Sequence, residues 1–142
     1  MKEILFYEEG VKLPSFFSGE LTEKWLDVIA SHYSRKIGTI SFIFCNDDYI
    51  LDVNRKYLNH DYYTDVITFD YCDGRTLSGD VFISLDTVRS NAVQFNTDFK
   101  TEFHRVVCHS VLHLIGFKDK TEPDSILMRE NENICLDLLK TI

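Results

Sequence analysis

Two histidines stand four residues apart in the apolar run CHSVLHLIGFKDK, residues 108–120. Residues at this spacing lie on one face of a helix, one turn above the other. We therefore expect His109 and His113 to direct their imidazoles toward a common point. Gly116 follows three residues after His113, and Asp119 three residues after that. Because glycine readily takes the conformation that ends helices, the chain can turn back and bring the Asp119 carboxylate to the same point.

The offsets 0, 4, 7 and 10 of these four residues predict a metal site. They match the HExxHxxGxxH arrangement of certain zinc hydrolases, with an aspartate in place of the third histidine. Two neutral imidazoles and one carboxylate suit Zn²⁺ and leave a fourth position for water, as in catalytic sites. Water bound in this way has a pKa of about 7 and supplies hydroxide at neutral pH. The alternative is that both histidines are core residues and Asp119 is a loop carboxylate.

The residue after His109 argues against one use of such a site. In peptidases of this spacing a glutamate at that position acts as the general base, whereas this chain has Ser110. A serine hydroxyl is far too weak a base at neutral pH. A zinc peptidase is therefore the less favoured alternative.

The elements that position these residues are predicted by the spacing of apolar side chains. Alternation and β-branched or aromatic composition predict strands at 3–9, 39–45, 64–71 and 78–84, the last two paired around Asp73-Gly74. Helical spacing predicts a helix at 20–36 and another that begins after the capping residue Asn46. It predicts a third over the segment marked by Val88, Ala92, Phe95 and Phe99. Two more are predicted at 101–114 and from Pro123 toward Leu139. We expect one α+β domain over residues 1–142, in which helices, one of them a zincin-like metal-bearing helix, cover a small mixed sheet of about four strands.

The same spacing predicts which helical residues face the core. In the helix after Asn46 the expected inward residues are Ile50, Val53 and Tyr57. In the final helix they are Leu127, Ile134 and Leu138.

Composition limits the classes of function. The chain has 142 residues, of which 44% are hydrophobic, and a net charge of −8, so it is globular and poorly suited to broad electrostatic binding of nucleic acid. No apolar run reaches the length of a membrane span, and the opening MKEILFYEEG lacks the pattern of a signal peptide, so a cytoplasmic location is expected. In that compartment thiols stay reduced, as we expect of Cys45, Cys72, Cys108 and Cys135.

One local segment could bind RNA despite the overall negative charge. RKYLNHDYY, residues 55–63, combines basic side chains with three tyrosines. Aromatic stacking and local positive charge bind single-stranded RNA without sequence readout. We predict RNA contacts from Arg55, His60 and Tyr62. The alternative is a helix end whose aromatic residues pack inward, which we favour for Tyr57.

Together these motifs resemble the YbeY family of single-domain endoribonucleases of rRNA maturation. The family's HGxLHLxGYDH motif reads HSVLHLIGFKD here, with Ser110 in place of the glycine and Asp119 in place of the final histidine. TDVITF (64–69) and SGDVFIS (78–84) resemble its TDVLSF and LGDIVIS strands, in the same order. LMRENENICL resembles its final helix through Met128 and Glu132.

The resemblance implies a single-strand-specific, metal-dependent endoribonuclease that acts on precursor rRNA. It implies one Zn²⁺ per chain, held by His109, His113 and Asp119, and the small ribosomal subunit as a partner of a monomer or weak oligomer. The sequence departs from the family's LNxxYRxKDxPTDVLSF segment at Leu58, where the family has an arginine; Arg55, Lys56 and His60 are the nearby basic residues. A non-catalytic ribosome-associated protein with a structural zinc is the alternative.

Overall fold

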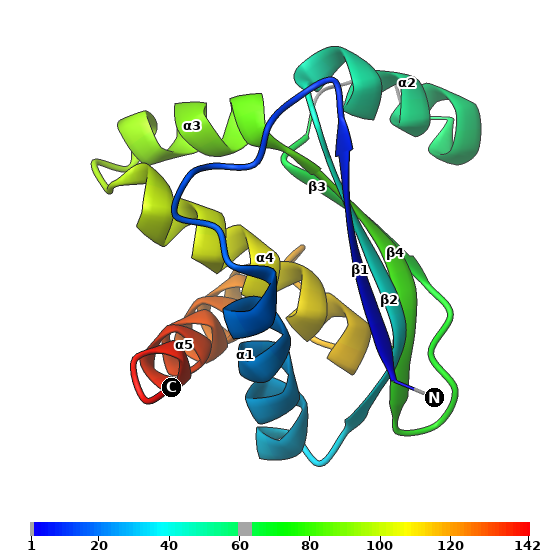
Figure 1. The fold of residues 1–142 in the computed structure, drawn as a ribbon, viewed down its shortest axis with the longest axis vertical. Helices are drawn as coiled ribbons and strands as arrows, with labels where there is room; N and C mark the ends of the chain where they lie inside the picture. Colours follow the sequence, from blue (N-terminus) through cyan, green and yellow to red (C-terminus); the bar gives the residue numbers. More distant parts are fainter. Residues whose placement is uncertain (1, 60–63) are drawn as a thin grey trace.

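The computed structural model describes residues 2–59 and 64–142 (Figure 1). Its elements, in chain order, are β1 (Glu3–Glu9), α1 (Gly19–His32), β2 (Lys36–Cys45), α2 (Asp47–Leu58), β3 (Val66–Asp70), β4 (Thr76–Ser84), α3 (Leu85–Gln94), α4 (Phe99–Ile115) and α5 (Glu122–Leu139). The strands form one mixed sheet, and the predicted α+β class is confirmed.

The sheet has the strand order β1-β2-β4-β3. β2 pairs in parallel with both β1 and β4, whereas β3 lies at the edge and pairs antiparallel with β4. The predicted pairing of the two strands around Asp73-Gly74 is therefore confirmed. The short turn that joins them is closed by mutual backbone hydrogen bonds between Asp73 and Thr76.

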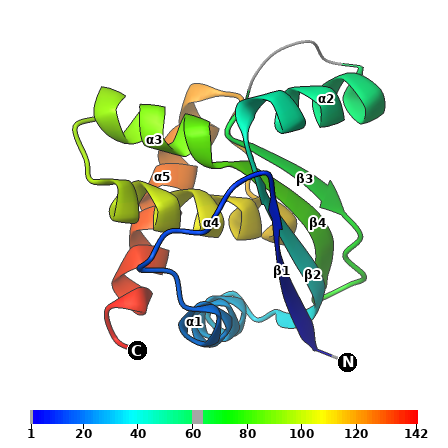
Figure 2. The ribbon, with the colours of Figure 1, turned by 45° about the horizontal axis from the view of Figure 1, so that its top comes forward.

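Successive side chains of a strand point to opposite faces of the sheet, and each face packs into a different hydrophobic core. Val81 and Ile83 of β4 belong to the larger core, which α1, α4 and α5 share, while Phe82 between them packs against the smaller core under α2. α4 contacts β3 and β4 on one side and α5 on the other (Figures 1 and 2). A helix in this position is buried on most sides, as predicted for 101–114.

A glycine in β4 allows the end of α4 to lie close to the sheet. A Cβ added to Gly79 would stand 2.5 Å from the carbonyl oxygen of Phe69 and 3.1 Å from Cδ2 of Leu114. Any larger residue would push apart the β3–β4 pair or lift this end of α4 from the sheet. The absence of a side chain at Gly79 thus lets the C-terminal turn of α4 pack directly on β4.

The inward face of α5 differs from the prediction. Leu127 and Ile134 are 47% and 38% exposed, and only Leu138 packs against the core as expected. The buried residues are Met128, Asn131, Glu132 and Cys135. Hydrophobicity alone predicted the wrong inward face because two of these residues are polar and are buried with partners. Asn131 accepts a hydrogen bond from the Tyr33 hydroxyl at 2.6 Å, and the Glu132 carboxylate contacts His109 and Arg105.

Three other details of the helices were predicted wrongly. Tyr57 is 69% exposed, and its ring makes an edge-on contact with Phe69. α1 and α3 are shorter than expected, because Ser34 and Asn96 take positive φ angles of 58° and 53° just beyond them. Phe95 is consequently 57% exposed.

The remaining expectations about the chain concern its thiols and hydropathy. All four cysteines are free thiols, as predicted. Within residues 2–59 and 64–142, no helix has both the length and the apolar character needed to cross a membrane.

Candidate metal centre

The end of α4 is specified by its local sequence. Gly116 has a φ of 124°, and its N–H donates to the carbonyl oxygen of His113, while the N–H of Phe117 donates to that of Leu112. These two bonds form a Schellman motif, which ends a helix and redirects the chain. The redirected segment carries Asp119 back toward α4.

This turn brings together the three residues that were predicted to share a site. Nε2 of His109 and Nε2 of His113 are 3.0 Å apart. Oδ2 of Asp119 lies 3.3 Å from the former and 3.5 Å from the latter. A tetrahedral ion with bonds of about 2.0–2.1 Å separates its ligand atoms by about 3.3–3.4 Å. The three distances lie within about 0.4 Å of this spacing, so the side chains could hold one such ion.

The other nitrogen of each ring explains why the Nε2 atoms are available. Nδ1 of His109 donates to Oε2 of Glu132 at 2.6 Å, and Nδ1 of His113 donates to the carbonyl oxygen of Phe117 at 3.0 Å. A neutral imidazole has only one N–H, so each Nε2 then presents a lone pair. Two lone pairs at 3.0 Å repel each other unless a proton or a cation lies between them. This donor set fits a metal ion.

The two rings differ in their electrostatic surroundings. Burial opposes a charge on His109, but the hydrogen bond and charge of Glu132, with further contributions from Asp65 and Asp119, outweigh it and raise the pKa of His109. Burial and the neighbouring charge of His109 lower the pKa of His113. Burial also disfavours the charged form of Glu132, but hydrogen bonds from His109 and Arg105 prevail and lower the pKa of its carboxyl.

The cluster opens onto a cavity of about 370 Å³ between α4 and α5. Its lining includes His109, Asp119, Glu132 and Arg129, and the Arg129 side chain is 59% exposed. A guanidinium at the mouth of this cavity can bind a phosphate oxygen. Neither Arg129 nor Glu132 was among the predicted site residues, because both come from α5, whose inward face was predicted wrongly.

Comparison with known proteins identifies the family of this chain. The sequence model of the family Endoribonuclease YbeY matches residues 4–140. The chain belongs to the YbeY family. A protein named Endoribonuclease YbeY from Bacteroides fragilis is 50% identical over 137 residues, covering 96% of this chain and 98% of that protein. One of the same name from Phocaeicola vulgatus is 52% identical over 136 residues, with the same coverage of both chains.

The fold has a counterpart among solved structures. The solution structure of TM1509 from Thermotoga maritima superposes with a TM-score of 0.65 and 26% sequence identity, covering 96% of this chain and 88% of that one. YbeY proteins are metalloenzymes, and the cluster of His109, His113 and Asp119 is a possible metal-binding group in this member.

The predicted RNA contacts line another cavity or lie outside the described residues. Arg55 lines a cavity of about 630 Å³ beside α2, whose lining shares no residue with the cavity at His109. His60 and Tyr62 lie outside the described residues. Leu58, at the position of the family's arginine, is the last residue of α2 and is 37% exposed.

Other polar residues near the motif have structural partners. The buried Ser110 hydroxyl donates to the carbonyl oxygen of Val107 at 2.6 Å, so Ser110 is turned away from the chemistry of the cluster. The Asp65 carboxylate accepts a hydrogen bond from the Asn91 side chain at 3.3 Å, and Asp70 accepts one from the backbone N–H of Cys72 at 2.8 Å. The carboxylate hydrogen-bonded to Nδ1 of His109 is therefore that of Glu132.

Proposed function

We propose that this chain is a zinc-dependent, single-strand-specific endoribonuclease that processes precursor rRNA, with residues 1–142 forming a single hydrolase domain. The family relationship supports RNA cleavage. The observation that carries the metal dependence is the convergence of two Nε2 atoms and one carboxylate oxygen within 3.0–3.5 Å of one another.

In this proposal His109, His113 and Asp119 hold the Zn²⁺. The bound ion supplies a Lewis acid for a phosphate oxygen and lowers the pKa of a water molecule to about 7. The acceptors Glu132 and Phe117 keep both Nδ1 atoms protonated, so that both Nε2 atoms remain ligands. Zinc suits this set because two imidazoles and a carboxylate are its usual catalytic ligands.

Arg129 is proposed to orient the RNA phosphate. Its exposed guanidinium shares the cavity with His109 and Asp119. In a chain with a net charge of −8, a single cation placed at the site of chemistry can hold a phosphate where the overall field would repel it. Arg55, His60 and Tyr62 remain the predicted contacts for the rest of the single strand.

The proposed setting is the cytoplasm, with the small ribosomal subunit as a partner of a monomeric or weakly associating chain. A strongly acidic protein gains little from long-range attraction to RNA. A ribosomal particle that already holds the precursor RNA would overcome this disadvantage.

The test compares zinc content and cleavage of single-stranded precursor rRNA in the wild type and in His113→Ala, with His32→Ala as the control. His32 is an exposed histidine on α1. We expect His113→Ala to lose both zinc and cleavage and His32→Ala to keep both. A zinc-free His113→Ala preparation that still cleaves would overturn the proposal, and zinc-loaded wild type that binds ribosomal particles without cleaving RNA would favour a structural zinc.

A further inference from the structure

Glu132 is a buried carboxylate with both oxygens engaged. Its side chain is 7% exposed. Oε2 accepts the N–H of His109 Nδ1 at 2.6 Å, and Oε1 accepts a hydrogen bond from Nη1 of Arg105 at 3.0 Å. Burial of an unpaired carboxylate costs several kcal/mol. The hydrogen bonds to His109 and Arg105, with the Arg129 guanidinium 3.9 Å from Oε1, offset this cost.

We propose that Glu132, held by Arg105, is a positioning residue that fixes the tautomer and orientation of the His109 ring and thereby sets the affinity of the site for its metal. This inference rests on the proposed function, because it assigns a role within the same metal site. Glu132 touches neither substrate nor metal in this account and acts only through His109.

The two histidines have different hydrogen-bond acceptors, and Glu132 is the acceptor of His109. His113 donates to a neutral backbone carbonyl provided by the turn at Phe117, at 3.0 Å. His109 donates to a carboxylate, at the shorter distance of 2.6 Å, as expected of a charge-assisted bond. A carboxylate partner makes the opposite ring nitrogen a stronger donor to a metal than a carbonyl partner does. Metal affinity therefore depends on α5, which contributes no ligand of its own.

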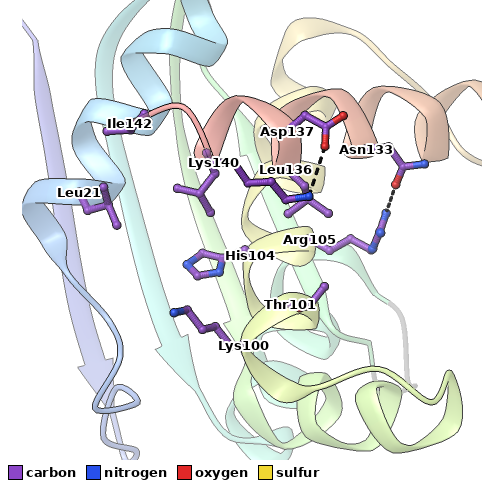
Figure 3. A pocket seen from close by; sticks show the side chains of 11 residues that line it. Leu21, Lys100, Thr101, His104, Arg105, Asn133, Leu136, Asp137, Lys140 and Ile142 are labelled. Atoms are coloured by element: carbon purple, nitrogen blue, oxygen red, sulfur yellow. Dashed lines mark hydrogen bonds and ion pairs between the residues drawn. The ribbon is translucent and has the colours of Figure 1, made fainter.

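Arg105 binds Glu132 through the carboxylate oxygen that His109 does not use. Its guanidinium also donates to Oδ1 of Asn133 at 3.1 Å, where it lines a separate cavity of about 520 Å³ between α4 and α5 (Figure 3). With its side chain only 14% exposed, Arg105 has little freedom to leave Glu132. The hydrogen bonds Arg105–Glu132–His109 thus connect this second cavity to the metal cluster.

The experiment measures zinc affinity by competition with a chromophoric chelator for the wild type, Glu132→Gln and the control Glu130→Gln. Glu130 is an exposed residue two positions earlier on α5. We expect Glu132→Gln to bind zinc about 10–100-fold more weakly, the usual effect of removing such a partner, and Glu130→Gln to match the wild type. Arg105→Met should weaken binding less, and should add no loss to Glu132→Gln because it acts through that residue.

A spectroscopic readout separates positioning from a merely structural role. In the zinc-loaded wild type, ¹⁵N-histidine spectra are expected to show a strongly hydrogen-bonded proton on Nδ1 of His109. In Glu132→Gln its resonance should move upfield, because an amide oxygen is a weaker acceptor than a carboxylate, while the Nδ1 proton of His113 is unchanged. If Glu132→Gln does not fold, the wild-type spectrum decides, since absence of that proton would overturn the inference.

The outcomes also separate this inference from the proposed function. Equal zinc affinity of folded Glu132→Gln and wild type overturns the positioning role alone. Failure of the wild type to bind zinc overturns the proposed function and this inference with it.

Discussion

At the scale of single residues, the cluster depends on how each imidazole is held. His109 and His113 were predictable because their spacing along one helix is a local property of the sequence. Glu132 was not, because it lies 23 residues from His109 in the chain and reaches it only through the packing of α5 on α4. A polar residue on an amphipathic helix is ordinarily assigned to solvent, and only the tertiary structure reveals that it has buried partners.

Arg129 gives a prediction about substrate binding. We expect Arg129→Ala to lower kcat/KM for single-stranded RNA by about 10–100-fold, because a hydrogen bond to a charged group contributes about 1.5–3 kcal/mol. Zinc affinity should change far less than kcat/KM, because Arg129 is not a ligand and its guanidinium stands 3.9 Å from Oε1 of Glu132, farther away than that of Arg105 at 3.0 Å. The control is Arg75→Ala, at an exposed arginine that does not line this cavity. Equal loss of activity in both variants would argue against a specific role for Arg129.

His104 gives a prediction about the pH dependence of stability. It packs edge-on against Trp25, with ring centroids 5.5 Å apart. Burial, with the charge of Lys100, lowers the pKa of His104 below 6.5. The unfolded chain then binds a proton more readily than the folded one, so stability present above pH 6.5 is lost as the pH falls through 6.5 toward the lower folded value.

We therefore expect His104→Phe to lose less of its free energy of unfolding than the wild type between about pH 7 and about pH 5.5. Urea titrations of both proteins at the two pH values measure this difference, and contributions of other groups cancel in the comparison. Parallel losses in the two proteins would show that His104 is not the source.

At the scale of elements, the site forms because the turn at the C-terminus of α4 returns Asp119 to the two histidines. The helix, its glycine and the returning segment were all predictable, because glycine at a helix end and a change in apolar periodicity are local signals. The positions of the strands and helices in the described chain followed from the same periodicity. The ends of α1 and α3 did not, since Ser34 and Asn96 take positive φ angles that residue type alone does not predict. The inward face of α5 was predicted wrongly because its buried residues include two polar ones, Asn131 and Glu132, that have hydrogen-bond partners.

Gly116 gives the corresponding prediction. A Cβ there would meet nothing within 4 Å, so the cost of a larger residue comes from the φ of 124° alone. Gly116→Asn should destabilise the fold by about 1–3 kcal/mol and weaken zinc binding by displacing Asp119. Gly74→Asn is the control, because its φ of 59° resembles the 55° that Asn59 already adopts, and we expect a change of no more than about 0.5 kcal/mol. Similar stability and zinc affinity in the two variants would contradict this account of the turn.

At the scale of the whole molecule, the proposed metal site couples zinc binding to folding. The proposed ligands come from α4 and the turn after it, and the partner of His109 comes from α5, so the site exists only when these elements are packed. A ligand that binds only the folded state stabilises it in proportion to the logarithm of its concentration. If the proposed site holds zinc, the stability of the chain depends on zinc as well as on its core.

We expect free zinc at 100 times its Kd to raise the free energy of unfolding by about 2.7 kcal/mol, and a chelator to reverse the increase. Thermal melts of the metal-stripped wild type and His113→Ala, each with and without zinc, provide the measurement. His113→Ala should show no zinc-dependent shift. A shift of equal size in both proteins would place the zinc elsewhere.

The central claim is that RNA cleavage requires the ion held by His109, His113 and Asp119. The most direct test restores zinc in steps to metal-stripped wild-type protein and measures the cleavage rate of single-stranded precursor rRNA at each step. The account predicts no cleavage without metal and a rate that rises with zinc until one ion is bound per chain, with His113→Ala inactive throughout. Full cleavage by the metal-free wild type, or a zinc response in His113→Ala equal to that of the wild type, would contradict it.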